Sequence, residues 1–115
     1  MAAQIVREPS AREVDVAVET MRLLADRTRL RIVWALLHGE HSVNELAEHV
    51  GMNAAAVSQH LAKLRLAHVV TVRRDGTRAY YSTDDEHVRS LAEQALFHSG
   101  HAAAPRHWER RGGGA

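Results

Sequence analysis

The sequence of 115 residues contains no cysteine. This absence excludes disulfide bonds, cysteine nucleophiles and thiolate metal sites, so any metal ion would have to be bound by nitrogen and oxygen atoms. Aromatic residues are scarce, at 4% of the chain against 45% for all hydrophobic residues. This composition favours a compact helical domain over an aromatic-rich sheet, and the length corresponds to one domain rather than to a multidomain enzyme.

Long apolar runs and a strong net charge are also missing. No stretch approaches 18 consecutive apolar residues, and the first residues lack the pattern of a leader segment, so we expect a cytoplasmic protein with no membrane partner. Net charge is only +1 with the histidines neutral, so attraction to nucleic acid depends on how the charges are distributed. What the chain has in excess is histidine, with nine residues.

The spacing of apolar residues predicts a mainly helical chain. Asp26 and Asn53 are placed to cap helices, Ser42 and Glu45 form a capping-box pattern, and Gly51 can end the short helix that this box begins. Including their caps, the predicted helices span residues 13–25, 26–38, 42–50, 53–66 and 85–99.

The third and fourth predicted helices are joined by a short turn and form a helix-turn-helix unit. Two runs, residues 69–74 and 78–82, flank Asp75-Gly76-Thr77, which predicts a β-hairpin. This order of elements predicts a winged helix-turn-helix, mainly α-helical with a small β-hairpin. The expected organisation is a flexible N-terminal arm, a DNA-binding and dimerisation domain and a flexible C-terminal tail, at residues 1–12, 13–101 and 102–115.

The charges are concentrated where a winged helix would meet DNA. Residues 54–82 carry five Lys or Arg and one Asp, a net charge of +4, whereas residues 83–101 have a net charge of −3. Small residues early in the fourth helix would let it enter the major groove, where Gln59 could pair with an adenine edge. Each residue alone is better explained as solvated surface, but the set favours double-stranded DNA. The expected contacts are Asn53, Ala54, Ala55, Ser58, Gln59, Lys63, Arg73, Arg74, Thr77 and Arg78.

A second pattern lies on the last predicted helix, where Asp85 and His87 are followed after ten residues by His98 and His101. Eleven helical residues advance three turns and about 20°, so His87 and His98 share a face, but they also rise about 16 Å. Ligands of one ion must each approach to about 2.0–2.2 Å, so one helix cannot close this site.

An antiparallel copy of this helix would bring Asp85 and His87 of one subunit beside His98 and His101 of the other. The homodimer would then hold two equivalent metal sites. This arrangement requires Asp85 to lie just before the regular helix. It would also bury an apolar stripe that needs a partner, formed by Val88, Leu91, Ala92, Ala95 and Leu96. The alternative is a set of ordinary surface residues, which the self-complementary spacing of all four makes the weaker interpretation.

At this point the chain resembles the ArsR/SmtB family of metal-responsive winged-helix repressors, over about residues 14–101. The residues that carry the resemblance are those at 24–32, 42–47 and 57–64, together with the last-helix pattern of Asp85, His87, His98 and His101. The resemblance implies a metal-free homodimer that binds operator DNA and is released by a divalent metal ion.

The resemblance also bears on which metal is sensed. The family's Cys-x-Cys sensor is absent from residues 43–48, so arsenic, lead and cadmium are not expected. Four-ligand members resemble tetrahedral zinc sensors, whereas nickel and cobalt sensors recruit tail ligands. His107 is placed to be such a fifth ligand or to belong to a solvated tail, and Gly100 stands where some nickel and cobalt sensors have Glu. His107 favours Ni(II) or Co(II), Gly100 weakens this preference, and Zn(II) is the alternative.

Two other hypotheses remain at this stage. A metalloenzyme could use Asp85, His87 and His98 as an open site, but the sequence shows no pocket-forming segments and no separate acid–base group, so we expect no enzyme. A winged-helix regulator could also ignore metal, or be activated by it. A metal titration of DNA binding separates these hypotheses.

Overall fold

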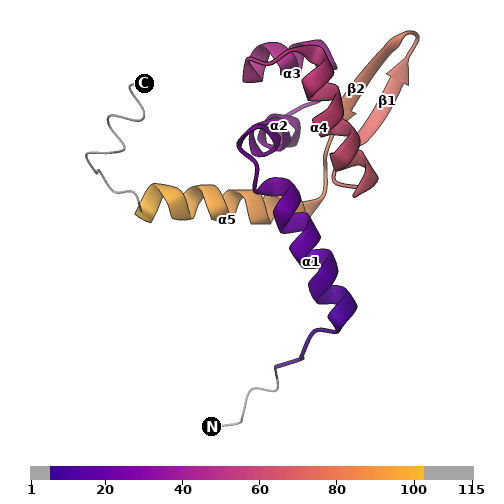
Figure 1. Ribbon diagram of the computed structural model, residues 1–115. Coiled ribbons are helices and arrows are strands. Elements are labelled where there is room, and N and C mark those ends of the chain that lie inside the picture. The colour runs from indigo at the N-terminus through magenta and orange to yellow at the C-terminus, as the bar shows by residue number, and fades with distance from the viewer. Residues whose placement is uncertain (1–5, 103–115) are drawn as a thin grey trace.

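The computed structural model describes residues 6–102, with side chains to residue 98. Helices surround one two-stranded antiparallel hairpin, which is the winged helix-turn-helix fold that the sequence predicts (Figure 1). Within the described range, none of the helices has the length and hydropathy needed to span a bilayer. The elements are α1 (Ala11–Leu24), α2 (Arg27–Leu37), α3 (Val43–Val50), α4 (Ala54–Leu66), β1 (Thr71–Asp75), β2 (Arg78–Ser82) and α5 (Glu86–Ala102).

Helix α2 forms the centre of the core. Its side chains Ile32 and Val33 are fully buried, and α3 and α5 pack against it from opposite sides (Figure 1). Helix α4 closes the core with one apolar face. The largest fully buried side chains are Ile32, Leu36, Leu46, Leu61, Leu64, Val33, Val57 and Val70.

The caps of the helix-turn-helix are those that the sequence predicts. Ser42 accepts a hydrogen bond from the N–H of Glu45, and the Glu45 side chain accepts one from the N–H of Ser42. Gly51 ends α3 in the left-handed region, with φ of 71°, a conformation that costs glycine little. The Asn53 side chain then accepts from Ala56 N at 2.8 Å and begins α4. These caps fix the angle at which α4 leaves α3.

Helix α1 begins at Ala11, earlier than the predicted Glu13. Ser10 and Glu13 form a second capping box that the apolar spacing does not reveal, so the last residues assigned to the N-terminal arm are helical. Only Leu23 and Leu24, at its C-terminal end, are buried. The rest of α1 projects away from the body of the molecule (Figure 1).

The hairpin is shorter at its start than predicted, because Val69 and Val70 are buried in the core before β1 begins at Thr71. Its strands pair in register from Thr71 with Ser82 to Asp75 with Arg78. A third segment joins the hairpin, since His41 and Tyr81 exchange backbone hydrogen bonds of 3.0 and 2.8 Å. The wing is therefore tied to the loop between α2 and α3.

Helix α5 begins at Glu86, so Asp85 lies immediately before the regular helix as the sequence analysis requires. The helix continues to Ala102, past the predicted end at Ser99. The predicted partner-facing stripe is only partly available, because Val88 and Ala92 are 4% and 1% exposed in the chain's own core. The spacing of apolar residues predicts that one face of a helix is buried, but it does not predict which neighbouring surface buries that face.

Candidate functional site

The outer face of α4 is open to solvent from its first residue. Val57, Leu61 and Leu64 turn inward with no exposed surface, which leaves the intervening positions on the outside. The expected DNA contacts of this helix are all exposed: Asn53, Ala54, Ala55, Ser58, Gln59 and Lys63. The carbonyl oxygen of Asn53 is committed to the cap of α4, so its amide N–H₂ is the group available to a ligand.

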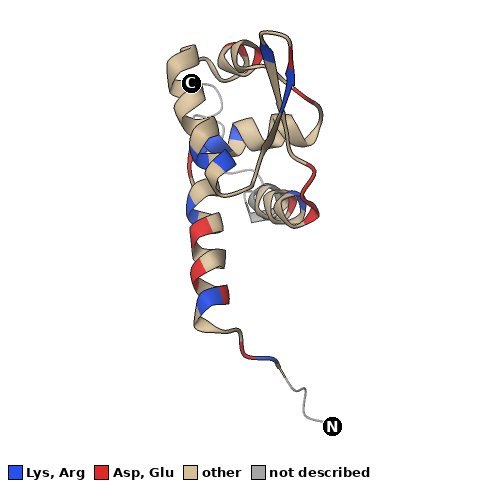
Figure 2. Ribbon diagram, turned by 90° about the vertical axis from the view of Figure 1, so that its right-hand side faces the viewer, with Lys and Arg blue, Asp and Glu red and all other residues tan. Residues whose placement is uncertain are grey.

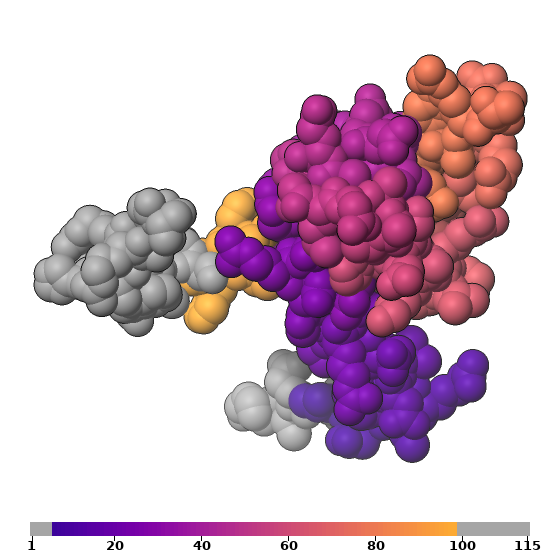
Figure 3. Space-filling model, turned by 45° about the horizontal axis from the view of Figure 1, so that its top comes forward, coloured from indigo at the N-terminus to yellow at the C-terminus, as the bar shows by residue number. Residues whose placement is uncertain are grey.

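The hairpin lies beside α4, as both Figure 1 and Figure 3 show. A groove of about 490 Å³ runs between them. It is lined by Ser58, Leu61, Ala62, Arg65, Leu66, His68 and Tyr81. Helix and wing thus present one continuous surface, with a depression between its two ridges.

This surface is the basic one. Figure 2 shows Lys and Arg on the hairpin and Asp and Glu around the start of α5. The wing residues Arg74, Thr77 and Arg78 are exposed, and the side chains of Arg74 and Arg78 make no hydrogen bond or ion pair to any described residue. They are free to meet phosphate groups, whereas the start of α5 would repel them.

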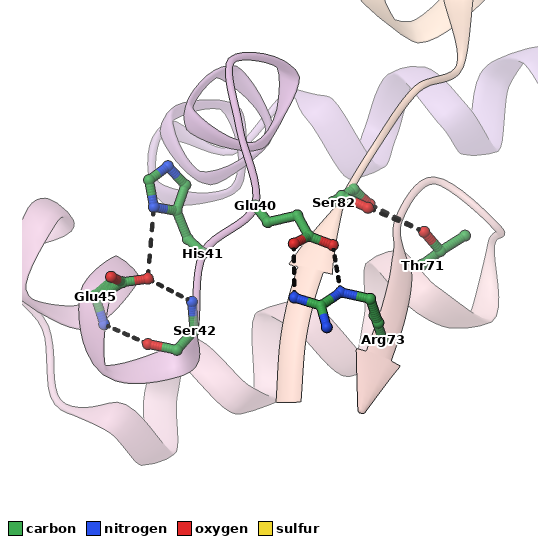
Figure 4. A network of polar contacts seen from close by, with 7 residues as sticks. All are labelled: Glu40, His41, Ser42, Glu45, Thr71, Arg73 and Ser82. Carbon is green, nitrogen blue, oxygen red and sulfur yellow. Dashed lines mark hydrogen bonds and ion pairs between the residues drawn. The ribbon is translucent and has the colours of Figure 1, made fainter. Parts of the chain in front are cut away.

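Arg73 is exposed as well, but it has an acidic partner that the sequence does not predict. Its guanidinium donates to Glu40 through Nε at 3.0 Å and through Nη2 at 2.9 Å (Figure 4). The same guanidinium carbon lies 4.9 Å from the centre of the Tyr80 ring. The hydrogen bonds to Arg73 hold the pKa of Glu40 below its usual range, and those to Glu40 raise the pKa of Arg73.

A second contact that the sequence does not predict joins Arg29 to α4. Arg29 donates through Nε to the carbonyl of Leu23 at 2.7 Å, and its Nη1 lies 3.2 Å from Nδ1 of His60. The backbone N–H of Arg29 in turn donates to the carboxylate of Asp26. This hydrogen bond is the main reason why the pKa of the Asp26 carboxyl is lowered. One arginine therefore links the end of α1, the start of α2 and the middle of α4.

The metal pattern is divided between the two ends of α5. Asp85 caps the helix through Oδ1, which accepts from the N–H of His87 at 2.8 Å and of Val88 at 3.2 Å. His87 and His98 are exposed. No group of three His, Asp or Glu side chains within the described residues is close enough to hold a metal ion.

The other two expected ligands cannot be placed in full. The backbone of His101 belongs to α5, but its side chain lies beyond the described side chains, and His107 lies outside the described residues. A single chain thus offers one end of the pattern, Asp85 with His87, separated from His98 by most of the helix.

Asp85 and His87 open onto a cavity of about 330 Å³ between α1, α5 and the turn after α4. His68, in that turn, is the one non-glycine among the described residues with positive φ, at 61°. The lining is Ala17, Thr20, Met21, Ala67, His68, Val69, Asp85, His87, Val88 and Leu91. The first half of the metal pattern therefore shares a cavity with the end of α4.

Large apolar side chains are exposed on the two helices that line this cavity, α1 and α5. Met21 of α1 is 49% exposed and Leu91 of α5 is 37% exposed. Val14 and Val16 of α1 and Phe97 of α5 are exposed to a similar degree or more. Apolar surface on two neighbouring helices is typical of a protein–protein contact.

Comparison with known proteins agrees with this geometry. The family model "Bacterial regulatory protein, arsR family" matches residues 26–72. The HTH-type transcriptional regulator KmtR of Mycobacterium tuberculosis is 52% identical over 103 residues, which cover 88% of this chain and 79% of KmtR.

Two solved structures share the fold. The AntR antimony-specific transcriptional repressor is similar with a TM-score of 0.80 and 30% identity, covering 90% of this chain and 95% of AntR. The homodimeric winged helix-turn-helix DNA-binding domain of Mb0332 from Mycobacterium bovis has a TM-score of 0.74 and 31% identity, covering 93% of this chain and 98% of that domain.

Proposed function

The chain belongs to the arsR family of bacterial regulatory proteins, and on this premise we propose that it is a metal-responsive repressor: a metal-free homodimer binds operator DNA and a divalent metal ion releases it. The chain is a transcription regulator with a DNA-binding fold and not an enzyme. A cytoplasmic location is part of the proposal, because a repressor must reach the chromosome.

DNA binding rests on one observation, the exposed face of α4 beside a basic wing. Helix α4 would enter the major groove, with Ser58 and Lys63 on phosphates and Gln59 on a base edge. The wing would contact the adjacent backbone or minor groove through Arg74, Thr77 and Arg78. In a two-fold dimer, the two α4 helices would meet successive major grooves about one helical turn apart.

The homodimer is proposed from the apolar surface that a single chain leaves uncovered. Met21 and Leu91 lie on neighbouring helices beside one cavity. A second copy of the same face would cover both helices by two-fold symmetry. The similar Mb0332 domain is homodimeric, which supports a dimer here without specifying its interface.

The residues of the metal pattern have the right chemistry for the ion. Imidazole nitrogen and carboxylate oxygen bind Ni(II), Co(II) and Zn(II). Asp85 uses Oδ1 for its cap, which leaves Oδ2 for a ligand. His87 and His98 are about 16 Å apart along the helix and therefore serve different ions. In the proposed site, Asp85 and His87 of one subunit meet His98 and His101 of the other.

We propose Ni(II) or Co(II) as the inducer and keep Zn(II) as the alternative. His107 as a fifth ligand would favour the first two, since zinc prefers four ligands. When bound, the ion would supply a cross-link between the two α5 helices.

The route from the metal to DNA would pass through the cavity that Asp85 and His87 share with His68. A shift of α5 at this cavity would displace the turn that follows α4. Coupling of this kind is typically about 1–3 kcal/mol, which weakens DNA binding about 5- to 150-fold. The linkage is reciprocal, so DNA must weaken metal binding by the same factor.

The test is fluorescence anisotropy of a duplex from the gene's own promoter. Metal-free protein should bind, and addition of Ni(II), Co(II) or Zn(II) in separate titrations should release it, with one ion effective at the lowest concentration. His49→Gln, which removes an exposed histidine of α3 outside the pattern, should respond as the unaltered protein does. Binding that no metal changes would contradict the sensor, and binding that metal tightens would make the protein a metal-activated regulator.

A further inference from the structure

The bidentate pair of Glu40 and Arg73 is the one ion pair among the described side chains that has two hydrogen bonds. Figure 4 shows the carboxylate and the guanidinium facing each other edge to edge. Tyr80, which is paired with Arg73 across the hairpin, stacks against the guanidinium. Arg73 is therefore held in one place by two acceptors and an aromatic face.

The backbone also holds Glu40 in place. Its neighbour His41 is bonded in both directions to Tyr81 of β2. Glu40 lies in the segment on one side of β2, and Arg73 lies in β1 on the other side. The ion pair therefore crosses β2. Arg73 and Glu40 are 33 residues apart in sequence, so the contact exists only when the wing is docked.

The other wing cations differ in this respect. Arg74 and Arg78 have no acidic partner among the described residues. All three arginines are exposed, and the side chain of Arg73 is 54% exposed even though it is paired with Glu40. A phosphate group could therefore reach Arg73, but the guanidinium charge is already paired with Glu40 and the Nε–Nη2 edge is occupied.

We propose that Glu40 acts as an internal substitute for a DNA phosphate and withholds Arg73 from the DNA backbone. The inference rests on the proposed DNA binding. Glu40 takes the Nε–Nη2 edge of the guanidinium and neutralises its charge, so a phosphate at the remaining Nη1 edge would gain little from Arg73. Non-specific affinity grows with the number of neutralised phosphates. Glu40 therefore lowers the sequence-independent part of DNA binding.

The experiment measures the affinity for an arbitrary duplex as a function of salt concentration, with anisotropy as the readout. It compares the unaltered protein with Glu40→Gln, Arg73→Gln and the double variant. Glu48→Gln is the matched control, because Glu48 is an exposed acid of α3 without an ion pair to any described residue. It removes the same charge without releasing an arginine.

Glu40→Gln should steepen the plot of log K against log salt by about 0.9, the effect of one more phosphate contact. The gain in affinity should be about eightfold at 0.1 M salt and vanish toward 1 M. Arg73→Gln should leave the slope unchanged, and the double variant should differ from Arg73→Gln by no more than Glu48→Gln differs from the unaltered protein. The double variant lacks the same ion pair as Glu40→Gln, so it controls for any loosening of the wing.

Two results would overturn the inference. One is a slope for Glu40→Gln no steeper than that for Glu48→Gln. The other is a slope for Arg73→Gln that is flatter by about 0.9, because it would mean that Arg73 makes a phosphate contact in spite of Glu40. If the unaltered protein bound no duplex at any salt concentration, the proposed DNA binding itself would fail.

Discussion

Arg89 of α5 donates a hydrogen bond of 2.7 Å from Nη2 to the carbonyl of Leu37, the last residue of α2. Carbonyls at the end of a helix have no partner within it, and Leu37 is buried, so this bond satisfies an acceptor that water does not readily reach. Arg89 is also 4.0 Å from both Glu86 and Glu93. The contact fastens the start of α5, with Asp85 and His87, to the core.

Arg89→Ala should lower the free energy of unfolding, because it leaves the Leu37 carbonyl without its charged donor. Hydrogen bonds to charged groups contribute about 1.5–3 kcal/mol. Chemical denaturation followed by circular dichroism measures the change. Arg74→Ala, on the exposed wing, serves as the control, and an equal loss in both variants would contradict the assigned role of Arg89.

Leu91→Glu should convert the proposed dimer to monomer, because it places a charge in the apolar face that a second copy would cover. Sedimentation equilibrium gives the oligomeric state, and DNA affinity should fall with it, since one α4 helix would be left to bind. Leu66→Glu changes another exposed leucine, on α4, and should remain dimeric. A Leu91→Glu protein that is still dimeric would place the interface elsewhere.

The cross-subunit metal site predicts complementation between two inactive variants. His87→Gln and His98→Gln should each abolish the metal response as homodimers and still bind DNA. In a mixed dimer of the two, one site loses both histidines and the other retains His87 from one chain and His98 from its partner. Such heterodimers should bind one metal ion, measured by equilibrium dialysis.

Differently tagged chains, unfolded together and refolded, provide the mixed dimers. A site contained within one chain would be lost in every subunit of such a mixture. Heterodimers that bind no more metal than either homodimer would therefore rule out the shared site.

Thr83 tests what it costs to bury a hydroxyl group without a hydrogen-bond partner. It is 6% exposed, and its Oγ1 has no hydrogen-bond partner in the described part of the chain. Thr83→Val replaces this hydroxyl by a methyl group and should stabilise the protein by about 1 kcal/mol. Thr83→Ser keeps the hydroxyl and loses the methyl group, so its melting temperature should fall. Equal destabilisation by both changes would show that the hydroxyl has a partner after all.

Acid should destabilise the fold in a defined window. The pKa of Glu40 is lowered chiefly by the Arg73 guanidinium and that of Glu45 chiefly by the N–H of Ser42. Because the native carboxylates hold protons less tightly than the unfolded ones, their contribution is complete above the ordinary carboxyl pKa, about 4.3, and lost as pH falls through the native values. Melting temperatures should drop as pH falls below about 4.3. Glu40→Gln should flatten this drop, while Glu48→Gln should retain it.

Local signals in the sequence account for most of the fold. The caps at Ser42, Asn53 and Asp26 depend on residues within three positions of each other, and each was predicted correctly. The position of Asp85 before α5 was also correct. Ser10 was missed, although Ser10 and Glu13 have the same capping-box spacing, because the residues around them show no apolar periodicity.

Contacts between distant residues could not be predicted in the same way. Glu40 and Arg73 are 33 residues apart, and Arg29 and His60 are 31 apart. Nothing in the spacing of either pair signals that folding brings them together. The last-helix stripe was only partly right for a related reason, since Val88 and Ala92 face the chain's own core while Leu91 is exposed, and periodicity alone does not distinguish one neighbour from another.

Helix α1, which buries only Leu23 and Leu24, has a thermodynamic consequence. A helix of 14 residues with so few tertiary contacts is marginal in water by itself. In the proposed dimer, ordering α1 and pairing subunits would therefore be one reaction governed by mass action. Its melting transition should move to higher temperature with each increase in protein concentration, while the core around Ile32 melts independently of dilution.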